Sequence, residues 1–245
     1  MRSGLLLFAR YAFPPNRLGY CGSSDHEGLF GYLTEDRADA GLRELAQKFE
    51  GAYPYLRLIA EANRQSDPFD PRVVEAYWIG NAFLARVGVS LFYESLRRRF
   101  QPRMDNRSFS AMTAALTDGT KPHHNFHVFE VYRRAGLLRD ERAVIALERM
   151  DQCRISWGRV KYVDGAEVIV DRSPLVLAGG KLALGPALPV RILRQIDGRG
   201  YLDDFRPGET VSIHWNWACD RLSISGFRAL SSATRSAIAH TNLTI

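Results

Sequence analysis

The hydrophobic pattern of the chain changes its period about three fifths of the way along, and this change restricts the fold more than any other feature. Up to residue 151, apolar side chains recur at the spacing of amphipathic helices. From Cys153 onwards, short runs of β-branched residues alternate with turns, as they do in strands. We therefore expect an α+β protein with two domains, an all-helical domain over residues 1–151 and a strand-rich domain over residues 152–245.

Helix signals recur through the first part of the chain. Asp70 is typical of a helix N-cap, and Pro71 suits the first helical position. Gly136 is expected to end the helix that precedes it. The apolar spacing predicts helices at 39–49, 55–64, 69–87, 89–100, 107–117, 124–135 and 139–151.

Turn signals divide the second part into short strands. Tight hairpin turns are indicated by Asp164-Gly165, Gly179-Gly180 and Asp197-Gly198. A turn followed by a strictly alternating strand is expected within 206–217, with Trp215 and Trp217 on one face and His214 on the other. The final segment returns to helical spacing. This pattern predicts a small OB-like β-barrel followed by a C-terminal helix.

Composition sets the broad class of the protein. An apolar fraction of 46% allows a buried core, and no apolar run approaches the roughly 20 residues that span a bilayer. The segment "LLLF" at 5–8 is too short for a signal peptide. Three cysteines, an odd number, favour free thiols. We expect a cytoplasmic protein without a membrane partner.

The net charge of +6 raises the question of nucleic-acid binding. The dense basic cluster is Arg97-Arg98-Arg99, and no basic stripe with interleaved aromatic residues surrounds it. A solvated helix face is therefore preferred, and we expect no nucleic-acid partner. Because small barrels often bind oligonucleotides, a nucleic-acid-binding module is kept as a third hypothesis.

Two stretches of the second part resemble a known family. "CRISWGRV" contains Cys153 followed at fixed spacing by Gly158-Arg159-Val160, and "PGETVSIHWNWACDRLS" contains His214 in a strand. Over roughly residues 152–235 the chain resembles the small hydrogenase-assembly chaperones of the HypC/HupF type.

The resemblance implies a function in nickel–iron hydrogenase maturation. Members of that family hold an iron that carries cyanide and carbon monoxide, and pass it to the hydrogenase large subunit. For this chain the resemblance implies that Cys153 and His214 bind that iron, with the large subunit or other maturation proteins as partners. A thiolate and an imidazole are suitable iron ligands. We expect His214 to face outward from the barrel, where a metal could be loaded and released.

The first part also carries a resemblance. Its segments "ARYAFPPNRLGYCG" and "EAYWIGN" resemble an uncharacterised helical family that is associated with hydrogenase gene clusters. That association concerns genomic context and implies no mechanism for the helical part.

A second candidate metal site lies in "KPHHNFHVFEVYRR", which contains His123, His124 and His127. His123 and His127 are four residues apart and share a helix face if the helix has begun by His123. Such a face binds iron or zinc. In the alternative interpretation, one histidine caps the helix and another packs in the core. The pattern leads to a second hypothesis, a metal-dependent enzyme with its active site in the helical domain, and the sequence leaves open whether the protein is an enzyme.

The segment "PPNRLGYCGSSDHEG", residues 14–28, is expected to be a loop because proline and glycine flank its polar residues. Arg17 could bind a small anion there, and Cys21 could act as a ligand or a nucleophile. A surface turn with local hydrogen bonds is an equally suitable interpretation.

Overall fold

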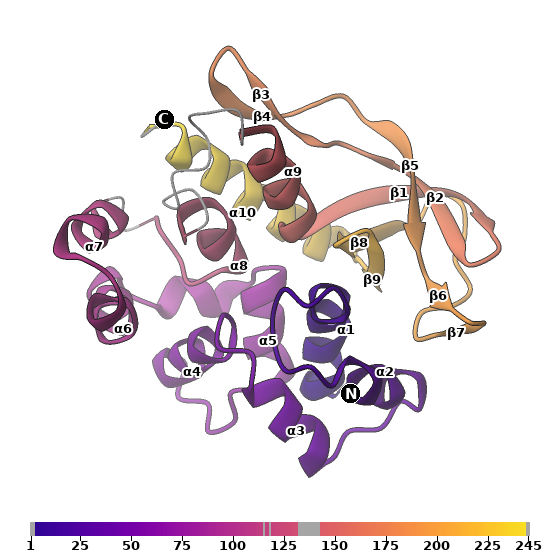
Figure 1. Cartoon of the computed structure of the whole chain (residues 1–245), viewed down its shortest axis with the longest axis horizontal. Helices are drawn as coiled ribbons and strands as arrows, with labels where there is room; N and C mark the ends of the chain where they lie inside the picture. The colour runs from indigo at the N-terminus through magenta and orange to yellow at the C-terminus, as the bar shows by residue number, and fades with distance from the viewer. Residues whose placement is uncertain (1–2, 115, 118, 132–142, 244–245) are drawn as a thin grey trace.

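The architecture follows the change of period in the sequence (Figure 1). The computed structural model describes residues 3–114, 116–117, 119–131 and 143–243. The described residues up to Cys153 are mainly helical, strands follow, and one long helix comes last, so the predicted α+β class is confirmed. None of the described helices combines the length and the apolar character that crossing a bilayer requires.

The helical part consists of short helices. They are α1 (Gly4–Arg17), α2 (His26–Thr34), α3 (Ala40–Gln47), α4 (Tyr53–Ala62), α5 (Pro71–Trp78), η1 (Ala82–Arg86), α6 (Val89–Phe100), η2 (Gln101–Arg103), α7 (Asn106–Thr113), α8 (His124–Phe126), η3 (His127–Val131) and α9 (Ala143–Cys153). The helices predicted at 39–49, 55–64 and 89–100 correspond to α3, α4 and α6.

The helix predicted over 69–87 is divided in two. Its start is confirmed, because the Asp70 side chain accepts a hydrogen bond from the backbone N–H of Arg72 and Pro71 begins α5. The helix ends at Trp78 because Gly80 adopts a φ of +99°, which an L-residue rarely tolerates. Asn81 then caps the separate turn η1.

Two other expectations for this part need correction. Residues 14–17 belong to α1 and residues 26–28 to α2, so the segment 14–28 is a loop only in its middle. The helix predicted from 124 begins there, but α8 is a single turn that continues as the π-helix η3. Residues 132–135 and 139–142, with the predicted stop at Gly136, lie outside the described residues.

Five of the strands close into a ring. They are β1 (Ser156–Asp164), β2 (Glu167–Arg172), β5 (Leu188–Leu193), β9 (Trp217–Arg221) and β8 (Thr210–His214), in that order around the ring. The closing pair, β5 and β9, is parallel and meets at Leu193 and Trp217, whereas the other neighbours are antiparallel. The predicted barrel is thus a mixed, ring-like sheet. Two separate hairpins, β3–β4 (Leu175–Ala178, Lys181–Leu184) and β6–β7 (Gln195–Ile196, Arg199–Gly200), extend from it.

The predicted hairpin turns at Gly179-Gly180 and Asp197-Gly198 are confirmed, and the third lies at Gly165-Ala166, one residue later than predicted. The strand predicted within 206–217 is present as β8, but it ends at His214, so the alternation predicted as far as Trp217 is wrong. The chain reverses at Trp215 and Asn216, which have φ values of +47° and +58°. A two-residue turn with both φ values positive matches the twist of antiparallel strands. Trp217 consequently begins the next strand and does not share a face with Trp215.

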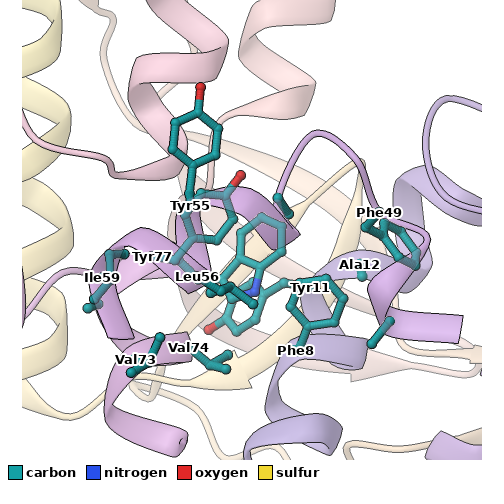
Figure 2. Packing of buried hydrophobic residues seen from close by; sticks show 14 of the residues in the cluster. Phe8, Tyr11, Ala12, Phe49, Tyr55, Leu56, Ile59, Val73, Val74 and Tyr77 are labelled. Carbon is teal, nitrogen blue, oxygen red and sulfur yellow. The ribbon is translucent and has the colours of Figure 1, made fainter. Parts of the chain in front are cut away.

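The helical core and the ring are joined through α1. Figure 2 shows Phe8 and Tyr11 of α1 packed with Tyr55 of α4 and Tyr77 of α5. The same hydrophobic cluster continues into the strands through Trp217, which meets Phe13 edge-to-face at 5.3 Å. The ring has its own small core, made mainly of valine and isoleucine side chains and completed by Ala218, Leu202 and Phe205. The division at residue 151 therefore separates two kinds of structure that share one core cluster.

The last helix, α10 (Ile224–Thr241), begins at Ser223, whose hydroxyl accepts a hydrogen bond from the Gly226 N–H. It packs against α8, η3 and β4. This helix therefore holds the histidine-containing turn against the second part of the chain.

Candidate metal centre

Three side chains of metal-ligating type meet where the helices contact the ring. His124 begins α8, Cys153 ends α9 and His214 ends β8. One ligand atom of each lies within 4.8 Å of those of the other two, and Cys153 Sγ lies 3.8 Å from His124 Nε2. A tetrahedral ion with bonds of about 2.3 Å to sulfur and about 2.0 Å to nitrogen separates two such atoms by about 3.6 Å. The cluster is close to these dimensions and could hold one metal ion.

All three side chains are buried, with exposed fractions of 5%, 6% and 1% for His124, Cys153 and His214. Burial lowers the pKa of His214 to about 4 and raises the pKa of Cys153 to about 12. The pKa of His124 lies well below its ordinary value because of burial and, after that, the nearby His214. The imidazoles are therefore uncharged at neutral pH, and the thiol has to release its proton when it binds a metal.

The orientation of His214 is set by the last turns of α1. His214 Nδ1 lies 2.6 Å from the carbonyl oxygen of Tyr11, so Nδ1 carries the proton and donates it. That carbonyl would normally accept the N–H of residue 15, but Pro15 has none. His214 Nε2 makes no well-formed hydrogen bond to any described residue, although the Cys153 carbonyl lies close enough to oppose, by a smaller amount, the lowering of the His214 pKa by burial. Its lone pair is thus left available, in the arrangement typical of a metal-binding histidine.

The neighbouring proline has a parallel effect at another place. Pro14 cannot donate to the carbonyl of Arg10, and the hydroxyl of Tyr201 donates to that oxygen at 2.9 Å. Both carbonyls released by the proline pair are therefore hydrogen-bonded to residues of the second part of the chain. The pair fixes α1 to the strands, and only Pro15 acts on the candidate centre.

His124 is held between two oxygens. Its Nε2 lies 2.8 Å from the carbonyl oxygen of Cys153, and its Nδ1 lies 3.2 Å from the hydroxyl of Tyr77. The Tyr77 hydroxyl also donates to the carbonyl of Gly51 at 3.3 Å. At 2.8 Å from a carbonyl oxygen, Nε2 carries the ring proton in this structure and donates it. For Nε2 to bind a metal, the proton has to move to Nδ1, where the Tyr77 hydroxyl can accept it while still donating to Gly51.

Aromatic rings enclose the cluster. The ring of Trp78 lies 4.7 Å from that of His124 and 5.7 Å from that of His214, centroid to centroid. Trp215 stands in the turn after His214, and its backbone N–H donates to the carbonyl of Gln152 at 2.9 Å. A tryptophan with positive φ is an uncommon and strained residue, a feature that often occurs at functional sites.

A cavity of about 70 Å³ lies beside the three side chains. Besides them, its walls include Tyr20, Cys21, His127 and Trp215. The ring of Tyr20 stacks on that of Trp215 at 4.1 Å with an interplanar angle of 19°. The space exceeds the roughly 15 Å³ that one water molecule requires, so the cavity could admit small ligands to a bound metal.

The structure brings together residues from both predicted metal sites. Cys153 and His214 of the second part lie beside His124 from the histidine-rich segment. His127 lines the same cavity, and its ring centroid lies 6.3 Å from that of His124. His123 lies elsewhere and lines a different cavity, together with residues of α10.

The expectation that His123 and His127 share a helix face is wrong. His123 has an extended backbone and caps α8, with its Nδ1 accepting the N–H of Asn125. The alternative interpretation, a capping histidine, is thus correct for this residue. Burial lowers the pKa of His123 to about 4.

His214 also differs from its expected surroundings. It lies outside the core of the ring, as predicted, but it is covered by α1 and α8 and does not face solvent. The sequence pattern describes the two faces of a strand and contains no information about a helix that covers one of them.

The two residues singled out in the segment 14–28 have different surroundings. Arg17 ends α1, and its guanidinium lies 6.0 Å from the ring centroid of Trp217. Cys21 lies in the loop after α1 and lines the cavity of the candidate centre. Burial raises the pKa of its thiol to about 12.

The supporting residues Tyr11, Tyr77 and Pro15 were not identified from the sequence. The two adjacent prolines are the one local signal that could have indicated Pro15, because they release backbone carbonyls if the helix continues through them. Tyr11 and Tyr77 have the spacing of ordinary core residues, and both are buried as such.

The donor set limits the metal. One sulfur and two imidazole nitrogens suit zinc, iron, cobalt, nickel or copper, whereas magnesium and calcium prefer oxygen ligands. Three protein ligands leave at least one coordination position for another group.

The chain was compared with protein families, curated proteins and solved structures. No curated protein and no solved structure matches the chain. One family model matches it from residue 1 to residue 245, the family of unknown function DUF6390, and the chain belongs to that family.

Proposed function

We propose that this protein binds one transition-metal ion through His124, Cys153 and His214, and that it serves as a metal carrier in the maturation of a nickel–iron hydrogenase. The observation that carries the metal-binding function is the meeting of the three side chains within 4.8 Å, although they are separated by up to 90 residues in the sequence. Their uncharged imidazoles and the unbonded Nε2 of His214 support it.

The choice of metal and pathway rests on the resemblance to the HypC/HupF chaperones. Two of the three side chains, Cys153 and His214, are those that the resemblance implies as iron ligands. The cavity of about 70 Å³ beside them is small and lined largely by aromatic residues, which suits an iron that carries compact ligands such as cyanide and carbon monoxide. The partner would be the hydrogenase large subunit or another maturation protein.

Metal content after anaerobic purification tests whether the three side chains bind a metal ion. We expect close to one ion per chain in the wild type and none in Cys153→Ala or His214→Ala. Cys219→Ala is the matched control, because Cys219 is buried near the same hairpin but its thiol is bonded to the Trp217 carbonyl. Equal metal content in wild type and Cys153→Ala would overturn the proposal.

Infrared spectroscopy tests the proposed function in hydrogenase maturation. After co-expression with the hydrogenase assembly proteins, we expect cyanide and carbonyl stretching bands in the wild type and their loss in Cys153→Ala. Bound iron without these bands would leave the metal centre in place and remove the maturation function.

A second candidate function is that of a metal-dependent enzyme. It is favoured by the three-ligand set beside a cavity, because catalytic metal sites keep a position for substrate. It differs from the enzyme expected from the helical part alone, since two of the three ligands lie beyond residue 151. For the enzyme we expect the ion to stay bound during incubation with EDTA, and for the carrier we expect its release to EDTA.

A further inference from the structure

The cavity beside the candidate centre approaches the surface at one end. Most of its lining residues are buried, but Tyr20 has an exposed fraction of 45%, and Cys21, Gly51 and His127 are partly exposed. A Cβ added to Gly51 would lie 3.7 Å from His127 Cε1, so these two residues are adjacent. These four residues form the outer end of the cavity.

Two side chains of the outer end are of metal-ligating type. Cys21 offers a thiol and His127 an imidazole, the same donor types that occur in the buried cluster. The buried cluster of three, within 4.8 Å of one another, does not include either of them. One cavity is thus lined by metal-ligating side chains both near the surface and in the interior. In the interior, His214 is 99% buried, and its Nε2 has no well-formed hydrogen bond to any described residue.

The loop that carries Cys21 is held in place. Asn16 Nδ2 donates to the carbonyls of Cys21 and Ser23 at 2.7 and 2.6 Å. A side chain at Gly22 would meet the ring of Phe49 at 2.5 Å, so the loop packs closely on the segment before Gly51. On its other side, Tyr20 stacks on Trp215. The Cys21 backbone is therefore fixed at the cavity, although the loop has no secondary structure.

We propose that Cys21 is the loading ligand of the metal centre, and that a divalent transition-metal ion enters through the outer end, binds Cys21 with His127 beside it, and passes by ligand exchange to Cys153. This inference rests on the proposed metal-binding function and goes beyond it. It gives a route to a cluster whose three ligands are each at least 94% buried.

The exchange requires no oxidant or reductant. Cys21 first releases its thiol proton to water as its sulfur displaces a water ligand from the ion. The bond from the metal to Cys153 sulfur then forms and the bond to Cys21 sulfur breaks, while the proton of the Cys153 thiol passes to the Cys21 sulfur. The ion keeps its charge throughout. His124 and His214 add two nitrogen ligands, which makes the inner position the more stable one.

Anaerobic stopped-flow mixing of the full chain with Co²⁺ tests the proposal. Each cobalt–thiolate bond absorbs in the near ultraviolet, so the rate of loading is observed directly. In Cys21→Ser and in Cys21→Ala we expect loading at least about tenfold slower than in the wild type, within the range of outer-ligand effects on metal sites. Both variants are expected to reach one Co²⁺ per chain with the wild-type final spectrum, because the resident sulfur is that of Cys153.

Further variants complete the test. His127→Gln is expected to slow loading by a smaller factor, and Cys219→Ser, a cysteine outside the cavity, to load at the wild-type rate. Wild-type loading rates in both Cys21 variants would overturn the inference, and so would a final spectrum with half the sulfur absorption, since Cys21 would then be a resident ligand. If the wild type binds no Co²⁺, the proposed function fails as well, which distinguishes the two failures.

Discussion

Two buried polar clusters lie on either side of the end of α9, and their hydrogen bonding differs. In the first, Asp151 accepts hydrogen bonds from Arg154, Arg172 and the Leu175 N–H at 2.8–2.9 Å. The remaining bonds of the two arginines go to the Ser156 hydroxyl and to the backbone carbonyls of Asp151 and Ser173. The second, the candidate metal centre, contains the unbonded His214 Nε2.

This difference separates a structural role from a binding role. The cluster around Asp151 has its charged groups hydrogen-bonded to one another, and it joins α9 to β2 and to the start of β3. Its polar groups are therefore already paired and are not available to a ligand. A buried cluster with an unbonded nitrogen pays an energetic cost unless something else binds it.

Removing the anion of the ionic cluster is expected to have the largest effect. Asp151→Ala leaves Arg172 and Arg154 buried without their carboxylate, and we expect the free energy of unfolding to fall by about 3–5 kcal/mol. Chemical denaturation of the metal-free protein measures this change. A loss below about 1 kcal/mol would remove the structural role from the cluster.

Metal binding is expected to stabilise the protein through the second cluster. At a free ion concentration of about 100 times Kd, binding to the folded state alone adds about 2.7 kcal/mol to the free energy of unfolding. A chelator should remove this gain in the wild type, and in Cys153→Ala there should be no gain to remove. A thermal shift with Co²⁺ that is equal in both proteins would mean that the ion binds elsewhere.

Pro15→Ala is expected to weaken the metal centre without weakening the helix. The new N–H at position 15 competes with His214 Nδ1 for the Tyr11 carbonyl, and we expect Co²⁺ affinity to fall about tenfold, the lower range for a change in an outer partner. Pro14→Ala is the matched control, because the carbonyl that it affects is bonded to Tyr201. Titration with Co²⁺ should separate the two variants, and equal losses of affinity would contradict the role given to Pro15.

The smallest effect is expected at an exposed ion pair. Asp67 accepts two hydrogen bonds from Arg43, which lower the pKa of its carboxyl group below the ordinary value. Its stabilisation is therefore present above the unfolded-state pKa of about 3.9 and is lost as the pH falls through the lower folded-state value. Since both side chains are about two fifths exposed, Asp67→Asn should cost no more than about 0.5 kcal/mol at neutral pH.

The pH dependence of that difference provides the check. The unfolding free energies of wild type and Asp67→Asn should converge as the pH falls below about 4, and also in high salt. A difference that persists at low pH would have to come from a source other than the ion pair.

The sequence predicted the fold best where local chemistry decides it. The change of period located the start of the strands to within a few residues, and the glycine-containing turns lie within one residue of where they were expected. The break at Gly80 was missed although a glycine is a local signal for the end of a helix. The reversal at Trp215 was missed because its positive φ is uncommon for a tryptophan, so the sequence carried no turn signal there. Two prolines suggested a loop, whereas the helix continues through them because other residues bond the released carbonyls.

The candidate site could be predicted only in part. Cys153 and His214 were indicated together by the family resemblance, and the structure places them together. His124 could not be distinguished from His123 in the sequence. Which of the two rings lines the cavity of the candidate centre depends on the residue at which α8 begins, and the sequence does not fix that residue. The cover that α1 provides over His214 depends on contacts between residues about 200 positions apart.

The wide spacing of the three candidate ligands has a consequence for metal selection during synthesis, if the proposed centre forms. A nascent chain that leaves the ribosome presents position 153 well before position 214, so the complete donor set is absent until the hairpin of β8 and β9 has been made and has folded against α1. An unfolded chain would offer isolated thiols, which take whichever ion binds most tightly in the Irving–Williams order. Because assembly of the proposed centre has to wait for the finished fold, the shape of the cavity and the supply of metal, rather than intrinsic affinity, would decide which ion it takes.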